Sequence, residues 1–343
     1  MRSQARRTLA TLFRLAITGG VLAFLAATLD WRSITNNLLR SDPGWLALAL
    51  LASGAAIVLT SARWWLLLKV QGITISFRSV NTLGFVSQFF NLFLLGSLGG
   101  DAAKFLLVAQ HAPLQKTRAA VSLLMDRAMG LGVVLCALLA VLPLQFEALT
   151  QSNSDAGTLY RALLLVFLLL IGVLNALAFV PFDRIADVRA GWLGRLARHR
   201  LLTLALEGFR DHLESKGLTA LALVLSFAVW GLIFAGAYAA GRSIALDASF
   251  IEVTTMVGVV VIAASLPISI AGHGIREGGF ILMFVLLAID APSGFHGQRE
   301  AAVAFSLLFF ALSAFWGLYG GLVFLWHREL HRHGRRHPAG VAE

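Results

Sequence analysis

The chain has 343 residues, of which 58% are apolar and only 13% charged, and its mean hydropathy is +0.79. This balance excludes a soluble protein and predicts a polytopic membrane protein that forms a single domain over residues 1–343. The net charge of +10 does not indicate nucleic-acid binding, because basic residues gather in the cytoplasmic loops of membrane proteins. The single cysteine, Cys136, lies in an apolar run, which excludes an intramolecular disulfide and a cysteine-based metal site.

Six apolar stretches are each long enough, at roughly 20 residues, to cross about 30 Å of hydrocarbon as a helix. They are residues 9–29, 44–62, 119–142, 159–181, 217–240 and 301–326. The first follows a basic N-terminus, as a signal peptide does, but its length and the later spans favour a membrane anchor. We therefore expect an all-α protein with about six full transmembrane helices.

Two more apolar stretches, 80–110 and 250–289, are interrupted where a spanning helix would be plain hydrocarbon. The interrupting residues are Gly96, Gly99, Gly100, Asp101 and Lys104 in the first, and Pro267, Gly272, Gly274, Arg276 and Glu277 in the second. Glycine carries a large entropy cost in a helix, and a charge deep in a bilayer costs at least a few kcal/mol. We expect each stretch to break into two half-helices and to line something polar.

Loop charges predict how these two stretches cross the membrane. The segments rich in Lys and Arg are 63–79, 111–118, 182–216 and the tail at 327–343, whereas 143–158 has none. If the basic segments and the N-terminus are cytoplasmic, both ends of 80–110 lie inside and both ends of 250–289 lie outside. Each stretch would then be a re-entrant helical hairpin, and half-helices of about 10–16 residues reach about 15–24 Å. The alternative is a single kinked span with one loop on the other side.

With the hairpins counted, residues 9–142 and 159–326 become two copies of opposite topology, an inverted repeat typical of transporters. The connector at 182–216 has apolar residues at near-helical spacing among Arg and Glu. It forms either one or two amphipathic helices on the inner leaflet or a soluble connector. We expect a multi-pass protein of a bacterial-type cytoplasmic (inner) membrane, with both termini cytoplasmic.

The ionisable residues expected at membrane depth are three acids and three bases: Asp101, Lys104, Asp126, Arg127, Arg276 and Glu277. Neighbours in sequence point about 100° apart on a helix, so Asp126 and Arg127 should find partners on the hairpins. Asp101 should serve as the N-cap of the second half-helix. The set is either a structural ion-pair network or, with the positive ends of the half-helices, a site for a phosphate or a lipid headgroup.

Further candidates for substrate binding and translocation surround these charges: Asn91, Ser97, Gly99, Gly100, Pro267, Ser269, Gly272 and Gly274. The polar ones, Asn91, Ser97 and Ser269, either coordinate a headgroup or satisfy the broken backbone. His273 is either a proton relay or a hydrogen-bonded bystander. The chain has no nucleophile elbow, zinc-protease motif or P-loop. We expect no catalytic residues, metal or cofactor, and a transporter rather than an enzyme.

Four motifs of the chain resemble a known family. They are RWWLLL at 63–68, FFNLFLLGSLGGDAAK at 89–104, DRAMGL at 126–131 and LPISIAGHGIREGGF at 266–280. They are similar to those of the transmembrane region of lysylphosphatidylglycerol synthases and its stand-alone, flippase-like relatives, and the likeness extends over roughly 10–327. One departure is Leu95, where relatives often carry Pro. We expect no aminoacyl-transferase domain like that of the full synthases, so the resemblance implies movement of a polar lipid between leaflets rather than its aminoacylation.

These observations lead to one expected function and two alternatives. We expect transbilayer movement of a polar, phosphate-bearing lipid or lipid-linked glycan through a charged mid-membrane cavity. Its partners would be membrane lipids and a lipid-modifying enzyme, and not nucleic acid. The first alternative is a membrane-embedded accessory subunit or enzyme of a glycolipid or lipid-linked sugar pathway, with the same charges as general acid or base. The second is a channel for ions or small solutes.

Overall fold

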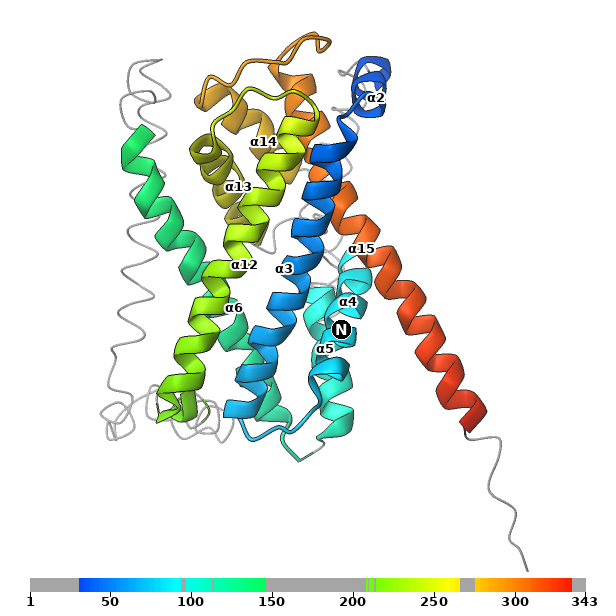
Figure 1. Cartoon of the computed structure of the whole chain (residues 1–343). Helices are drawn as coiled ribbons and strands as arrows, with labels where there is room; N and C mark the ends of the chain where they lie inside the picture. The colour runs from blue at the N-terminus through cyan, green and yellow to red at the C-terminus, as the bar shows by residue number, and fades with distance from the viewer. Residues whose placement is uncertain are drawn as a thin grey trace, which may run out of the picture.

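The computed structural model describes residues 31–93, 97–112, 114–145, 208, 210–212, 214–265 and 275–334, and throughout these ranges the regular structure is helical (Figure 1). Four helices are long and apolar enough to cross a membrane: α3 (Pro43–Val70), α6 (Lys116–Val141), α12 (Lys216–Ser243) and α15 (Gln298–Gly334). They confirm helices at four of the six expected spans. The other two, 9–29 and 159–181, lie outside the described residues, as does most of the connector at 182–216.

Helix α3 begins where the sequence indicates but ends later than expected. Asp42 caps it, since its Oδ1 accepts hydrogen bonds from the backbone N–H groups of Gly44 at 2.8 Å and Trp45 at 3.1 Å, and proline follows at the first helical position. We expected this span to stop before Arg63. Instead the helix continues through Arg63, which is only 5% exposed, to Val70. The assignment of Arg63 to a cytoplasmic loop was therefore wrong.

Each interrupted stretch forms two short helices that pack against each other. The first gives α4 (Phe77–Phe93) and α5 (Ser97–His111), and the second gives α13 (Phe250–Ser265) and α14 (Ile275–Leu286). Figure 1 shows the first pair in the lower half of the bundle and the second pair in the upper half, while α3, α6 and α12 run along most of its height. The expectation that each stretch forms two helices is confirmed, but α5 already begins at Ser97, before Gly99 and Gly100, where the first break was expected.

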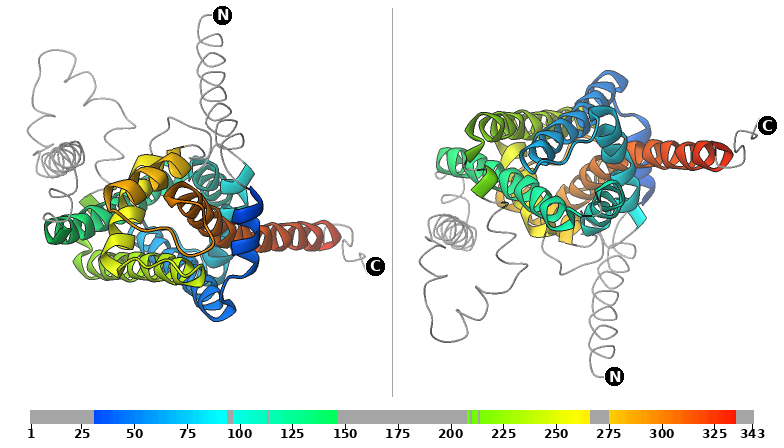
Figure 2. Two further views of the ribbon diagram at one scale, coloured as in Figure 1. Left: turned by 90° about the horizontal axis from the view of Figure 1, so that it is seen from above. Right: turned by 90° about the horizontal axis from the view of Figure 1, so that it is seen from below.

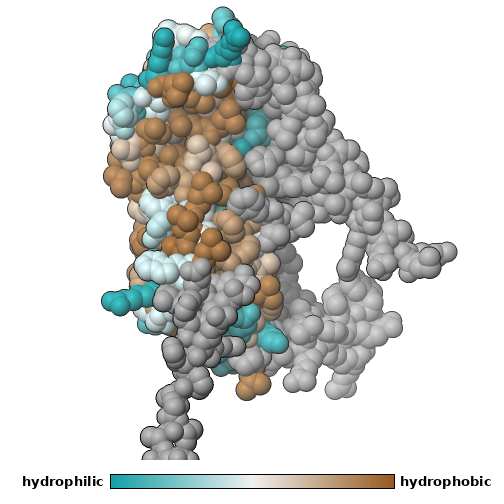
Figure 3. Space-filling model, turned by 90° about the vertical axis from the view of Figure 1, so that its right-hand side faces the viewer, coloured by the Kyte–Doolittle hydropathy of each residue, from teal (hydrophilic) through white to brown (hydrophobic). Residues whose placement is uncertain are grey.

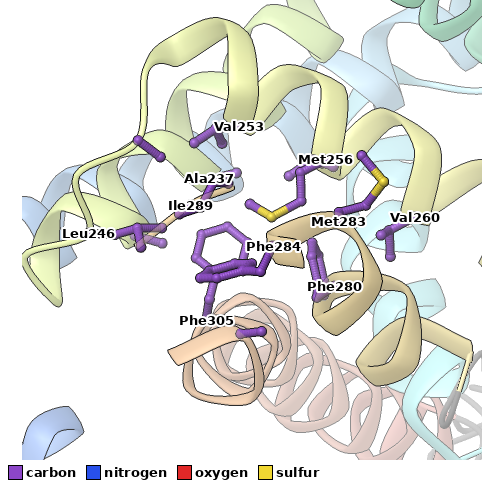
Figure 4. Close-up of a cluster of buried hydrophobic side chains, with 14 of the residues drawn as sticks. Ala237, Leu246, Val253, Met256, Val260, Phe280, Met283, Phe284, Ile289 and Phe305 are labelled. Atoms are coloured by element: carbon purple, nitrogen blue, oxygen red, sulfur yellow. The ribbon is translucent and has the colours of Figure 1, made fainter. Parts of the chain in front are cut away.

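The main apolar core holds α14 in place (Figure 4). Phe280 of α14 meets Phe305 of α15 edge to face, with ring centroids 5.2 Å apart, and Met256 of α13 packs on the same cluster. Lipid tails are as apolar as these side chains, so close packing and ring geometry stabilise the contact, not removal from water. An aromatic pair of this kind contributes about 0.5–1.5 kcal/mol. The core fixes the position of the first turn of α14, which carries Arg276 and Glu277.

Helix α15 approaches α4 through a face of small residues. A Cβ atom on Gly320 would fall on the carbonyl oxygen of Phe85, and one on Gly321 would lie 2.6 Å from the ring of Phe89. Glycine at these positions lets the two helices come close enough for backbone and side chain to touch. The contact joins the first short-helix pair to the last long helix of the chain.

Two elements differ from the expected plan. Residues 30–43 were expected to form a loop, but they contain the short helix α2 (Trp31–Leu39), whose Ile34 is fully buried against Val303 and Ala304 of α15. The tail expected from residue 327 begins as a continuation of α15 to Gly334. The C-terminal half of α15 extends away from the bundle (Figure 2). A broad apolar band crosses the face drawn in Figure 3, with hydrophilic residues gathered at its top, as suits a surface that contacts lipid.

Candidate functional site

Helix α6 carries two neighbouring charges that pair with different helices. The carboxylate of Asp126 accepts a hydrogen bond from Nε of Arg63 on α3 at 2.6 Å, and Nε of Arg127 donates to Asp101 on α5. Neighbouring residues on a helix point about 100° apart, which explains the two directions. We expected both residues to find partners on the interrupted stretches. This holds for Arg127, which contacts α5, and was wrong for Asp126, which pairs with the long helix α3.

The Arg63–Asp126 pair is deeply buried and ties three long helices together. Their side chains are 6% and 10% exposed, and Nη1 of Arg63 also donates to Oγ of Ser226 on α12 at 3.1 Å. Arg63 was not among the predicted site residues, because a charge after an apolar stretch normally marks the end of a span. The signal that could have found it is the run WWLLL directly after it, which continues the apolar pattern for more than another turn.

The Asp101–Arg127 pair is more accessible, with the two side chains about one-third exposed, at 28% and 32%. Helix α5 begins at Ser97, so Asp101 is the fifth residue of the helix and not its N-cap, which corrects the expectation. As an interior residue, Asp101 projects sideways toward α6 rather than back over the helix end.

The helix break is stabilised by Asn91 of α4. Its Oδ1 accepts a hydrogen bond from the backbone N–H of Gly100 at 2.8 Å, which favours the backbone-satisfying role for Asn91. Gly99 and Gly100 are both buried. A Cβ atom on Gly100 would lie 2.6 Å from the carbonyl oxygen of Ser87, so the two short helices touch at backbone distance there.

Lys104 lies one turn further along α5 and is buried, at 8% exposure. Among the described residues no carboxylate lies within 4 Å of its ammonium group. The ammonium lies instead over the ring of Trp64, 5.1 Å from the ring centroid. The indole N–H of Trp64 donates to Oγ of Ser122 on α6 at 3.2 Å, which fixes the ring. Such a cation–π contact is worth about 0.5–2 kcal/mol.

We call five charged side chains the α6 charge cluster: Arg63, Asp101, Lys104, Asp126 and Arg127. It contains three positive and two negative groups, so its formal charge is +1. Asp126 is ten residues into α6, about 15 Å from the start of the helix at 1.5 Å per residue. If α6 begins at the membrane face, that depth is close to the middle of a hydrocarbon layer of about 30 Å. An excess positive charge at such a depth favours an anionic ligand.

The second short-helix pair contributes one ion pair, Arg276 with Glu277. These residues are second and third in α14, as expected for the start of a half-helix. Contrary to expectation they also contact each other, with Nη2 of Arg276 2.5 Å from Oε1 of Glu277. The long, flexible side chain of arginine allows this between neighbours. The Nε of Arg276 also donates to Oγ of Ser306 on α15 at 3.2 Å, and its guanidinium lies 4.8 Å from the ring centroid of Phe310.

The remaining predicted site residues cannot be placed. Pro267, Ser269, Gly272, His273 and Gly274 lie outside the described residues. Within the described ranges no group of three or more His, Cys, Asp or Glu side chains could hold a metal ion. The structure thus joins the charges of the first interrupted stretch to α6 and α3, and places Arg276, paired with Glu277, against α15.

A family model described as the lysylphosphatidylglycerol synthase TM region matches residues 11–321. The match covers nearly the whole chain, including both interrupted stretches, α6 and the start of α15. No curated protein matches the chain.

Proposed function

Because this chain belongs to the lysylphosphatidylglycerol synthase transmembrane-region family, we propose that it moves a polar, phosphate-bearing lipid or lipid-linked glycan between membrane leaflets. The observation that carries the proposal is the accessible Asp101–Arg127 ion pair together with the buried Lys104, which has no carboxylate partner among the described residues. A chain that needed only rigidity at this depth would be at least as stable with apolar residues, since buried ion pairs contribute little to stability. Charges retained in a membrane interior are a mark of function.

The arrangement of the short helices supports a pathway across the membrane. The α4–α5 pair and the α13–α14 pair lie at opposite ends of the bundle (Figure 1). We infer that each is a re-entrant hairpin, one from the cytoplasmic face and one from the other face of an inner membrane. Residues 9–142 and 159–326 would then form inverted repeats around a mid-membrane site, the plan of many alternating-access transporters.

In this mechanism the headgroup exchanges with the protein's own ion pairs while the acyl tails stay in the bilayer. Arg127 offers a planar set of donors that suits a phosphate, and Asp101 holds this guanidinium when no lipid is bound. Arg276, whose partners Glu277 and Ser306 lie on α14 and α15, receives the headgroup from the opposite side. Exchange of one partner for another keeps the charges matched in both states, which alternating access requires.

Leaflet exchange by the purified chain in liposomes tests the proposal. Asp101→Ala and Arg276→Ala each remove a charge-assisted contact worth about 1.5–3 kcal/mol, so lipid movement should fall at least about tenfold while the protein stays inserted. The matched controls are Asp247→Ala and Arg299→Ala, because both side chains are exposed and far from α6 in sequence. Wild-type rates in both site variants would overturn the proposal. A chemically altered lipid without leaflet exchange would favour the enzyme alternative.

A further inference from the structure

The α6 charge cluster contains two ion pairs and one basic residue without an acidic partner among the described residues. Arg63 and Asp126 neutralise each other in the interior, and Asp101 and Arg127 neutralise each other where solvent or a headgroup can reach them. Lys104 is left over, and it lies over the face of Trp64. The empty cluster therefore consists of two neutral pairs and one buried cation whose only compensation among the described residues is an aromatic ring.

Asp101 is within reach of a second partner on its own helix. Lys104 follows it by three residues on α5, and side chains with this spacing lie on the same face of a helix. In the structure Asp101 contacts Arg127. Opposite charges at this spacing can pair on a helix, so Lys104 is a second basic partner for the Asp101 carboxylate when it leaves Arg127.

We propose that Lys104 sets the net charge of the lipid headgroup, so that the site takes a phosphodiester lipid with one excess negative charge. This inference rests on the proposed function and deepens it. The phosphodiester binds Arg127 and displaces Asp101, which turns to Lys104. The loaded cluster then contains three neutral pairs: lipid with Arg127, Asp101 with Lys104, and Asp126 with Arg63.

Headgroups of other net charge leave the cluster unbalanced. A zwitterionic headgroup brings no net charge: its phosphate still binds Arg127, but its own ammonium group is then left as an uncompensated positive charge in the cluster. Uncompensated charge away from water is strongly unfavourable. Lys104 thus acts as a specificity-determining residue even though Arg127 makes the direct contact with the phosphate.

The test compares two lipids on the purified full-length chain. The probes are phosphatidylglycerol, with one net negative charge, and phosphatidylcholine, with none. Binding is followed by the lipid-dependent shift of the thermal unfolding midpoint in detergent, and leaflet exchange by acyl-labelled versions of the same lipids in liposomes. The variants are Lys104→Gln, the charge-preserving Lys104→Arg, and Lys116→Gln, a control at an exposed lysine at the start of α6.

The wild-type chain and Lys116→Gln should bind phosphatidylglycerol at least about tenfold more tightly than phosphatidylcholine, the ratio for one charge-assisted contact. Lys104→Gln should bring the two affinities close together, and Lys104→Arg should restore the preference. The inference is overturned if the wild-type chain shows no preference, or if Lys104→Gln retains it. Lipid movement without a charge preference would refute this inference and leave the proposed function intact. A Lys104-dependent binding preference without lipid movement would support this inference and refute the proposed function.

Discussion

The two ion pairs made by Asp126 and Arg127 should differ sharply in their contribution to stability. Asp126→Ala removes the carboxylate of the Arg63–Asp126 pair, and Asp101→Ala removes the carboxylate of the Asp101–Arg127 pair. Asp126→Ala leaves Arg63, 5% exposed, with only the Ser226 hydroxyl as a described hydrogen-bond partner. Asp101→Ala leaves Arg127, whose side chain is 32% exposed.

The expected magnitudes follow from these exposures. Breaking a buried ion pair by removing one partner costs about 3–5 kcal/mol, because a buried charge is left uncompensated. Accessible pairs are usually worth about 0–1 kcal/mol, because water or headgroups replace the lost partner. Asp126→Ala should therefore lower the free energy of unfolding by about 2 kcal/mol or more beyond Asp101→Ala. The double variant Arg63→Met/Asp126→Leu, which removes both charges, should recover most of the loss.

Reversible unfolding in mixed micelles, with sodium dodecyl sulfate as denaturant and helicity as the signal, measures these free energies. The comparison of two Asp→Ala variants of one chain keeps the change in side-chain volume the same. Equal losses for Asp101→Ala and Asp126→Ala would refute the division into a fixed and an exchangeable pair. So would a double variant as unstable as Asp126→Ala alone.

Three further predictions concern packing and pH. Gly320→Leu would drive a side chain into the Phe85 carbonyl, so it should lower the free energy of unfolding by about 1–3 kcal/mol or more in the same assay. The control is Gly132→Leu, which should have little effect because a Cβ at this position meets nothing within 4 Å. Gly100→Ala should separate α4 from α5, because its Cβ would lie 2.5 Å from Oδ1 of Asn91; faster amide hydrogen exchange in α5, with α12 unchanged, is the expected readout. Burial lowers the pKa of His212, against the opposing effects of its Gly208 hydrogen bond and of Asp211. The folded state therefore favours neutral histidine. His212 contributes stability at pH values above its ordinary pKa of about 6.5, and this stability is lost as pH falls toward the lowered pKa. The unfolding midpoint of the wild type should therefore fall between pH 7.5 and pH 5, and that of His212→Gln should fall less.

The sequence predicted the helices and the breaks because both follow from local costs. The length of an apolar stretch identifies a span. Glycines beside charges identify an interruption, whatever the tertiary structure around them. The family motifs around Asp101 and Asp126 also lie together in the structure, where Asp101 on α5 contacts Arg127 on α6.

Partners and exact boundaries depend on the folded chain and were harder to predict. Arg63 is tolerated inside a span only because Asp126, 63 positions later, lies against it, and no local pattern encodes that distance. Asp101 was placed at a helix end because glycines precede it, whereas α5 begins four residues earlier at Ser97. The Arg276–Glu277 contact depends on the reach of one flexible side chain, which spacing rules alone do not describe.

The central claim is that the two interrupted stretches enter and leave the membrane by the same face, from opposite sides, and bring their charges to mid-depth. Single cysteines introduced at exposed positions on either side of each pair test it, in a Cys136→Ala background. The positions are Ser76 and Leu114 for α4–α5, and Ser249 and Asp290 for α13–α14. A membrane-impermeant thiol reagent should label the first two from the cytoplasmic face only and the last two from the other face only. Labelling of the two ends of either pair from different faces would contradict the inverted plan and the lipid pathway built on it.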